Sequence, residues 1–196
     1  MLIAGLTGGM ACGKSFVARA FTELGCFVVE ADELGHEVLL PGGDAFEPVV
    51  AAFGRDILNP EGQIDRSALA AVVFANPVEL ARLNAIVHPA VRNLALRRMK
   101  ESKAPVVVYV AAILIESGAY KDVQKIIVVT CPREQQVERS LDRPGATQAG
   151  VLARLERQMP LEEKKKHADY LIDTSGTREE TLRQTRIVWE DLIRQA

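Results

Sequence analysis

The chain has 196 residues, of which 48% are hydrophobic and 26% charged, and its formal net charge is -2. This length suffices for one domain with its own hydrophobic core. The balanced charge argues against a global basic field that would recruit nucleic acid or a membrane surface, so any anion must be bound locally. Three widely spaced cysteines fit neither a disulfide framework nor a zinc site, and we expect a cytoplasmic protein.

The N-terminal segment predicts the beginning of a parallel sheet. Residues 2–6 are apolar and are typical of a buried strand, and a glycine-rich turn follows them. A helix is expected over residues 15–24, with Gly25 ending it, and a second strand over residues 26–29. The apolar start lacks the basic residues of a signal peptide, and no run is long enough to span a bilayer.

The middle of the chain, residues 33–102, has a mostly helical pattern. Asn76, Pro77 and Glu79 suit the N-cap, first and third positions of one helix. Pro89 is expected to end that helix, with another helix over residues 91–99. The sequence therefore predicts a helical insertion after the second strand.

The sheet is expected to resume in the last part of the chain. The predicted elements are strands over 106–115, 125–130 and 170–173, helices over 133–142 and 148–158, and a final helix after Thr177. In the final helix, Leu182, Val188, Trp189 and Leu192 should face the core. The Lys164–Lys166 run is typical of a solvated face, although it could also meet substrate phosphates.

A phosphate-binding pattern lies between the first strand and the first helix. Residues 8–15 match G-x-x-x-x-G-K-[ST], in which glycines let the backbone curl around an anion at a helix N-terminus. Lys14 is expected to reach the β- and γ-phosphates of ATP, and the Ser15 hydroxyl to ligate Mg²⁺. The predicted nucleotide-binding residues are Gly8, Gly9, Met10, Ala11, Cys12, Gly13, Lys14, Ser15 and Phe16.

Two carboxylates follow predicted strands, where ligands collect in open α/β sheets. Asp32 follows the second strand, where it could orient or deprotonate an attacking hydroxyl, or could be only a helix cap. Glu116 follows the third strand and has the same two interpretations, a site residue or a capping residue.

Two arginines are spaced for one helix face. Arg139 and Arg143 are four residues apart and precede Pro144-Gly145. Mobile arginines can neutralise the charge that develops during phosphoryl transfer while a lid excludes water. The alternative is a pair of solvated surface arginines.

Several segments together resemble the dephospho-CoA kinase family over nearly the whole chain. They are Gly5-Leu6-Thr7-Gly8-Gly9, Val29-Glu30-Ala31-Asp32, Leu83-Asn84-Ala85-Ile86-Val87-His88-Pro89, Ile113-Leu114-Ile115-Glu116, Gln158-Met159-Pro160-Leu161-Glu162-Glu163-Lys164 and Ala168-Asp169-Tyr170-Leu171-Ile172-Asp173. The P-loop alone is generic, whereas the His-Pro segment and the last two segments are specific.

The resemblance implies a P-loop NTPase fold of α/β class, with a parallel five-stranded sheet, a helical substrate-binding insertion and a helical lid. The implied parts are a core of residues 1–32, 103–138 and 168–196, a substrate subdomain over 33–102 and a lid over 139–167. The implied reaction is ATP-dependent phosphorylation of the ribose 3′-hydroxyl of dephospho-CoA, the last step of coenzyme A synthesis, by a monomer or weak homo-oligomer.

The resemblance also assigns roles to individual residues. Catalysis is expected from Asp32, Lys14, Arg139 and Arg143, and substrate contacts from Asp32, His36, His88 and Glu116. Among the departures from the family pattern, His36 stands where an arginine is usual, which puts substrate affinity in question because imidazole cannot pair bidentately with an anion.

Two other functions remain open from the sequence. One is another small-molecule P-loop kinase, acting on a nucleoside or nucleotide. The other is a non-catalytic nucleotide- or CoA-binding relative. A GTPase is disfavoured because no Asn-Lys-x-Asp segment occurs.

Overall fold

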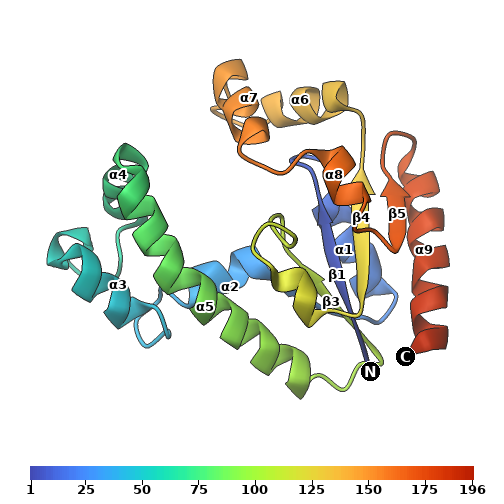
Figure 1. The fold of residues 1–196 in the computed structure, drawn as a ribbon, viewed down its shortest axis with the longest axis horizontal. Coiled ribbons are helices and arrows are strands. Elements are labelled where there is room, and N and C mark those ends of the chain that lie inside the picture. The colour runs from blue at the N-terminus through green and yellow to red at the C-terminus, as the bar shows by residue number, and fades with distance from the viewer. The chain divides into compact units, whose positions relative to one another are not determined.

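The computed structural model describes residues 1–196, which form two compact units (Figure 1). The first unit comprises Met1–Val29 and Glu101–Ala196, and the second is Glu30–Lys100. None of the helices has both the length and the apolar character that crossing a bilayer requires.

The first unit is built on a parallel sheet with the strand order β2-β3-β1-β4-β5. Its strands are β1 (Leu2–Gly8), β2 (Phe27–Glu30), β3 (Val106–Val110), β4 (Lys125–Thr130) and β5 (Tyr170–Asp173). In the central register, Leu6 of β1 lies opposite Val110 of β3 and Ile127 of β4. The predicted five-stranded parallel sheet is therefore confirmed, and the carboxyl ends of β1, β3 and β4 lie at one edge.

Two long helices of this unit cover one face of the sheet. The helices are α1 (Lys14–Glu23), η2 (Ala119–Asp122), α6 (Arg133–Leu141), α7 (Gln148–Glu156), α8 (Leu161–Lys165) and α9 (Arg178–Gln195). Helices α1 and α9 pack together, and α9 runs alongside β5 (Figure 1). Their buried side chains, including Val17, Phe21, Val188 and Leu192, form the main core with alternate residues of β1, β3 and β4. This packing fixes the position of the loop between β1 and α1.

The second unit is almost entirely helical, as predicted for this stretch. It contains α2 (Ala31–Glu37), α3 (Phe46–Phe53), η1 (Arg55–Ile57), α4 (Arg66–Ala75) and most of α5 (Pro77–Glu101). The Asp65 carboxylate caps α4 by accepting hydrogen bonds from the Ser67 (2.8 Å) and Ala68 (3.2 Å) N–H groups. The buried residues of the second unit include Leu34 of α2 and Val49 of α3.

Three expectations about individual elements were wrong. Strand β3 ends at Val110 instead of continuing to residue 115. Leu114 and Ile115 are still buried, but the chain turns there, with the Ser117 N–H bonded to the Ile113 carbonyl (2.9 Å). An apolar run does not distinguish a buried strand from a buried turn, because burial alone selects the apolar residues.

The second error concerns Pro89, which lies inside the continuous helix α5. A proline within a helix removes one backbone hydrogen bond and costs about 3 kcal/mol. Here the next turns bury Ala90, Leu94 and Met99, and this packing offsets the cost of the proline.

The third error is Leu182, which is 41% exposed on α9. Thr181 and Thr185 occupy the buried face instead, with their hydroxyls bonded to the Thr177 (3.1 Å) and Thr181 (2.8 Å) carbonyls. Because helical hydroxyls can satisfy themselves locally, polar threonines are tolerated where the pattern suggested leucine.

Candidate active site

The loop between β1 and α1 approaches its neighbours closely, and at Gly8 only glycine fits against the backbone of β4. A Cβ atom at Gly8 would lie 2.3 Å from the Val129 carbonyl oxygen of β4, and one at Gly9 would lie 2.6 Å from Gln136 Oε1 of α6. Gly13 precedes α1 with a φ of 78°. The first turn of any helix leaves N–H groups without intrahelical partners, so the loop and α1 together form a cradle suited to phosphate.

Ala11 is the only non-glycine residue with a positive φ, at 55°. This left-handed conformation costs an L-residue about 1–2 kcal/mol. Glycine adopts this conformation without that cost, so the backbone at position 11 favours glycine.

Lys14 lies across the opening of the loop. Its Nζ atom donates to the carbonyl oxygens of Gly8 (3.1 Å) and Gly9 (2.9 Å). The following residue, Ser15, is solvent-exposed in the first turn of α1. The two side chains with the chemistry for phosphate and metal binding are therefore both at the loop.

Cys12 of the loop is buried against Cys131, which follows β4. The Sγ atoms of Cys12 and Cys131 are 3.4 Å apart, and both thiols are free. Burial, and then the contact with Cys131, raises the pKa of Cys12 to about 12. A thiol that stays protonated is a poor nucleophile, so Cys12 serves as a packing residue.

Thr174, which the sequence analysis missed, ties Arg139 to the loop. Its hydroxyl lies within hydrogen-bonding distance of the carbonyls of Cys12 (3.0 Å) and Thr130 (3.2 Å). Arg139 donates to the Thr174 hydroxyl (3.2 Å) and to its carbonyl (2.8 Å). The only signal in the sequence is its place directly after β5, at the carboxyl end of a parallel strand.

Arg143 lies elsewhere, beside the tip of the loop. It lines a cavity of about 260 Å³ together with Met10 of the loop and Arg154 of α7. The same cavity is lined by Ser140, whose buried hydroxyl has no hydrogen-bond partner. Arg139 and Arg143 are thus placed differently: Arg139 is bonded to Thr174, which contacts the loop, whereas Arg143 lines a cavity beside the loop.

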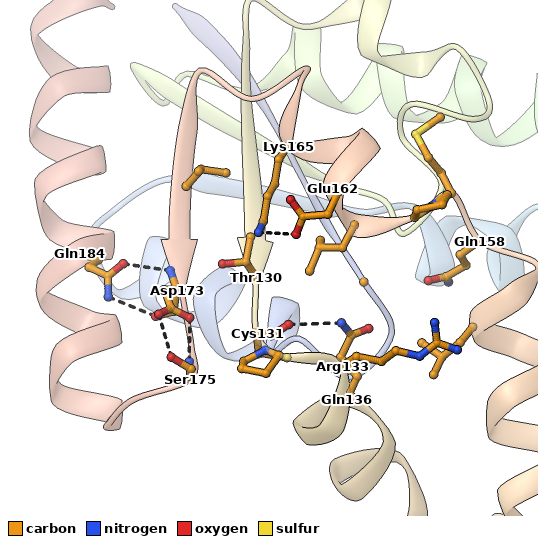
Figure 2. Close-up of a pocket in the computed structure, with 17 residues that line it drawn as sticks. Thr130, Cys131, Arg133, Gln136, Gln158, Glu162, Lys165, Asp173, Ser175 and Gln184 are labelled. Atoms are coloured by element: carbon orange, nitrogen blue, oxygen red, sulfur yellow. Dashed lines mark hydrogen bonds and ion pairs between the residues drawn. The ribbon is translucent and has the colours of Figure 1, made fainter.

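A larger cavity of about 640 Å³ lies at the carboxyl ends of β4 and β5 (Figure 2). It adjoins the phosphate loop through Gly9, and its walls include Arg133 of α6 and Lys165 of α8. Lys165 is paired with Glu162 (2.7 Å), as Figure 2 shows. The volume is in the range of small-molecule binding sites.

Glu116, in the turns after β3, forms an ion pair with the buried Lys164. Lys164 is 0% exposed, which corrects its expected place on a solvated face, and its Nζ atom contacts Glu116 Oε1 (2.9 Å) and the Ala112 carbonyl (2.6 Å). Burial alone would raise the pKa of Glu116, but hydrogen bonds from Lys164 and from backbone N–H groups, including that of Met159, hold that pKa below its usual value. The pair joins the turn after β3 to the segment that follows α7.

In the second unit, Asp32 and His36 lie four residues apart on α2. Asp32 is exposed in the first turn of the helix, and Glu30 is the N-cap residue, so Asp32 is not the helix cap. Burial raises the pKa of Glu30, and the negative charges of Glu33 and Asp32 raise it further. His88 is exposed on α5, beside Pro89.

Comparison with known proteins supplies the assignment that the loop alone cannot give. The profile of the family described as dephospho-CoA kinase matches residues 2–180. The chain belongs to this family. It is 46% identical to a dephospho-CoA kinase of Geobacter metallireducens over 98% of each chain.

Solved structures agree with membership of the dephospho-CoA kinase family. The dephospho-CoA kinase from Campylobacter jejuni is 29% identical, with a TM-score of 0.73 over 98% of both chains. TT1252 from Thermus thermophilus is 33% identical, with a TM-score of 0.84 over 97% of both chains. The chain is accordingly a P-loop kinase that uses a nucleotide and acts on a small molecule.

Proposed function

We propose that this chain transfers the γ-phosphate of ATP, bound as its magnesium complex, to the ribose 3′-hydroxyl of dephospho-CoA. The observation that carries the proposal is the glycine cradle at residues 8–15 with Lys14 across its opening, in a chain of the dephospho-CoA kinase family. The products are coenzyme A and ADP.

The residues of the loop fit a triphosphate. Position 8 admits no Cβ because the loop backbone lies against β4, and Gly9 lies close to the Gln136 side chain of α6. Lys14 would exchange its two carbonyl contacts for the β- and γ-phosphate oxygens, and the exposed Ser15 hydroxyl would hold Mg²⁺. The metal would neutralise part of the negative charge of the phosphates.

Asp32 is the proposed general base. The 3′-oxygen of the acceptor forms a bond to the γ-phosphorus as the bond from that phosphorus to the β-γ bridging oxygen breaks, which releases ADP. The proton of the hydroxyl passes to the Asp32 carboxylate, which is exposed on α2 and therefore accessible to a substrate. Arg143 would neutralise charge on the transferring group, while Arg139 would hold Thr174, which contacts the loop.

We assign the helical residues 33–102 to substrate binding and residues 139–167 to a lid. The second unit, Glu30–Lys100, contains Asp32, His36 and His88. Residues 139–167 include α7, and they line both cavities beside the loop. Closing such a segment over the phosphates would exclude water from the reaction.

An acceptor panel tests the proposed function. We expect Mg-ATP consumption, followed as ADP release, to be stimulated by dephospho-CoA at least about a hundredfold over adenosine, AMP or shikimate, measured as kcat/KM. Omission of Mg²⁺ should abolish the stimulation. A nucleoside that outcompetes dephospho-CoA would instead identify another small-molecule kinase.

A further inference from the structure

Arg66 of the second unit has an unusual partner for an arginine. Its Nη2 atom lies 2.9 Å from Nε2 of His36. Arginine can only donate, so Nε2 accepts and the imidazole proton is on Nδ1. Both side chains are solvent-exposed, so the guanidinium keeps donors that a ligand can reach.

The charge of Arg66 is not neutralised by a carboxylate, in contrast to the charges of three arginines on α5. Arg82, Arg97 and Arg98 of the same unit each pair with an acidic side chain. The adjacent Asp65 makes no ion pair with Arg66, and its Oδ1 atom caps α4. Arg66 is thus a cation bonded to the neutral imidazole of His36, in a unit that has more acidic than basic side chains. Such a cation is suited to binding an anionic ligand.

The position of this guanidinium relates it to Asp32. Asp32 and His36 are four residues apart on α2, so their Cβ atoms are about 5–6 Å apart on one face of the helix. Arg66, bonded to His36, therefore lies on the same face as the proposed base. In dephospho-CoA one ribose ring separates the reacting 3′-hydroxyl from the 5′-diphosphate, and this spacing is of the same order.

We propose that Arg66 binds the 5′-diphosphate of the acceptor and that His36 is the residue that positions it. The inference rests on the proposed function and adds a specificity-determining residue to it. Arg66 then supplies the guanidinium that the family pattern places at position 36, from α4 instead of α2. Acceptors that lack a 5′-phosphate group are disfavoured because they leave the Arg66 guanidinium unpaired.

Steady-state kinetics of Arg66→Gln, with Arg97→Gln as matched control, tests the inference. We expect Arg66→Gln to raise the KM for dephospho-CoA roughly 10- to 100-fold, since a charge-assisted bond to phosphate is lost. Its kcat should stay within about threefold of the wild type, and the KM for ATP should not change. Arg97→Gln removes the same charge from an exposed ion pair and should alter neither constant.

Two further variants separate binding from a structural role. Arg66→Lys should recover part of the affinity, because a lysine offers the charge but not the planar fork. His36→Ala should raise the same KM to a lesser degree, and should have no further effect when combined with Arg66→Gln.

The inference is overturned if Arg66→Gln leaves the KM for dephospho-CoA unchanged, or if kcat and the KM for ATP change along with it. A wild-type enzyme that turns over another acceptor but not dephospho-CoA would overturn the proposed function, and this inference with it. The two failures are distinguishable because only the second appears in the wild type.

Discussion

At the scale of single residues, the phosphate loop shows backbone strain at Ala11 that its sequence motif does not indicate. Ala11 occupies a left-handed backbone conformation that glycine adopts without cost. The pattern of the loop tolerates any residue at this position, so the motif itself is silent on the strain. The φ angle follows from the curl that brings Gly8 and Gly9 against β4 and α6.

We predict that Ala11→Gly stabilises the fold by about 0.5–1 kcal/mol, because relief of the backbone strain exceeds the entropy that glycine adds to the unfolded chain. Urea unfolding of the two proteins measures the difference. Ala51→Gly, at an exposed position inside α3, is the control and should destabilise by a similar amount. If both changes destabilise equally, the strain at Ala11 is absent.

At the scale of elements, the ion pair of Glu116 and Lys164 connects segments that lie far apart in the sequence. Lys164 on α8 bonds the Ala112 carbonyl after β3, and that carbonyl also accepts a hydrogen bond from the Thr7 hydroxyl at the end of β1 (3.3 Å). Glu116 in turn accepts from the Met159 N–H (3.1 Å), just after α7. This network therefore links the approach to the phosphate loop with the end of the proposed lid.

We predict that Lys164→Met destabilises the protein by about 1–2 kcal/mol, because it removes the bond to the Ala112 carbonyl and leaves the partly exposed Glu116 carboxylate without its partner. Adding Glu116→Gln should restore a large part of that loss, since no unpaired charge remains. Thermal or urea unfolding checks both values. A double variant no more stable than Lys164→Met would show that the pair does not govern the effect.

The same ion pair has a pH dependence whose sign follows from the pKa of Glu116. That pKa is lowered in the folded protein relative to an unfolded value of about 4.3. The contribution of the ion pair to stability is therefore fully present above the unfolded pKa of Glu116. It is lost as the pH falls through the folded pKa. Lys164→Met should consequently destabilise less in acid than at neutral pH.

Helices and strands with strong local sequence signals were predictable. The errors occurred where tertiary packing determined the end or the continuity of an element. The strand at Tyr170–Asp173 and the cap at Thr177, whose hydroxyl accepts the Glu180 N–H (3.1 Å), agree with the sequence. The end of β3 and the continuity of α5 through Pro89 depend on packing that no local pattern encodes. The part played by Thr174 was invisible for the same reason, because it depends on where β5 ends relative to the loop.

At the scale of the whole molecule, the phosphate loop and the proposed base belong to different units. Lys14 and both arginines, Arg139 and Arg143, are in the first unit, whereas Asp32, His36 and Arg66 are in the second. The motif predicted nucleotide use, and the family segments predicted the acceptor. Arg66 could not be singled out from the sequence, because an exposed arginine is common and only its contact with His36 distinguishes it.

The most direct test of the account is the mass of the acceptor after incubation with Mg-ATP, wild-type protein or Asp32→Asn, with ATP affinity measured separately. We predict that the wild type converts dephospho-CoA into a product heavier by one phosphoryl group, with the mass of coenzyme A. Asp32→Asn should bind ATP normally yet form product at least about a hundredfold more slowly, because general-base catalysis is lost. Unmodified dephospho-CoA with the wild type, or equal product formation by Asp32→Asn, would contradict the account.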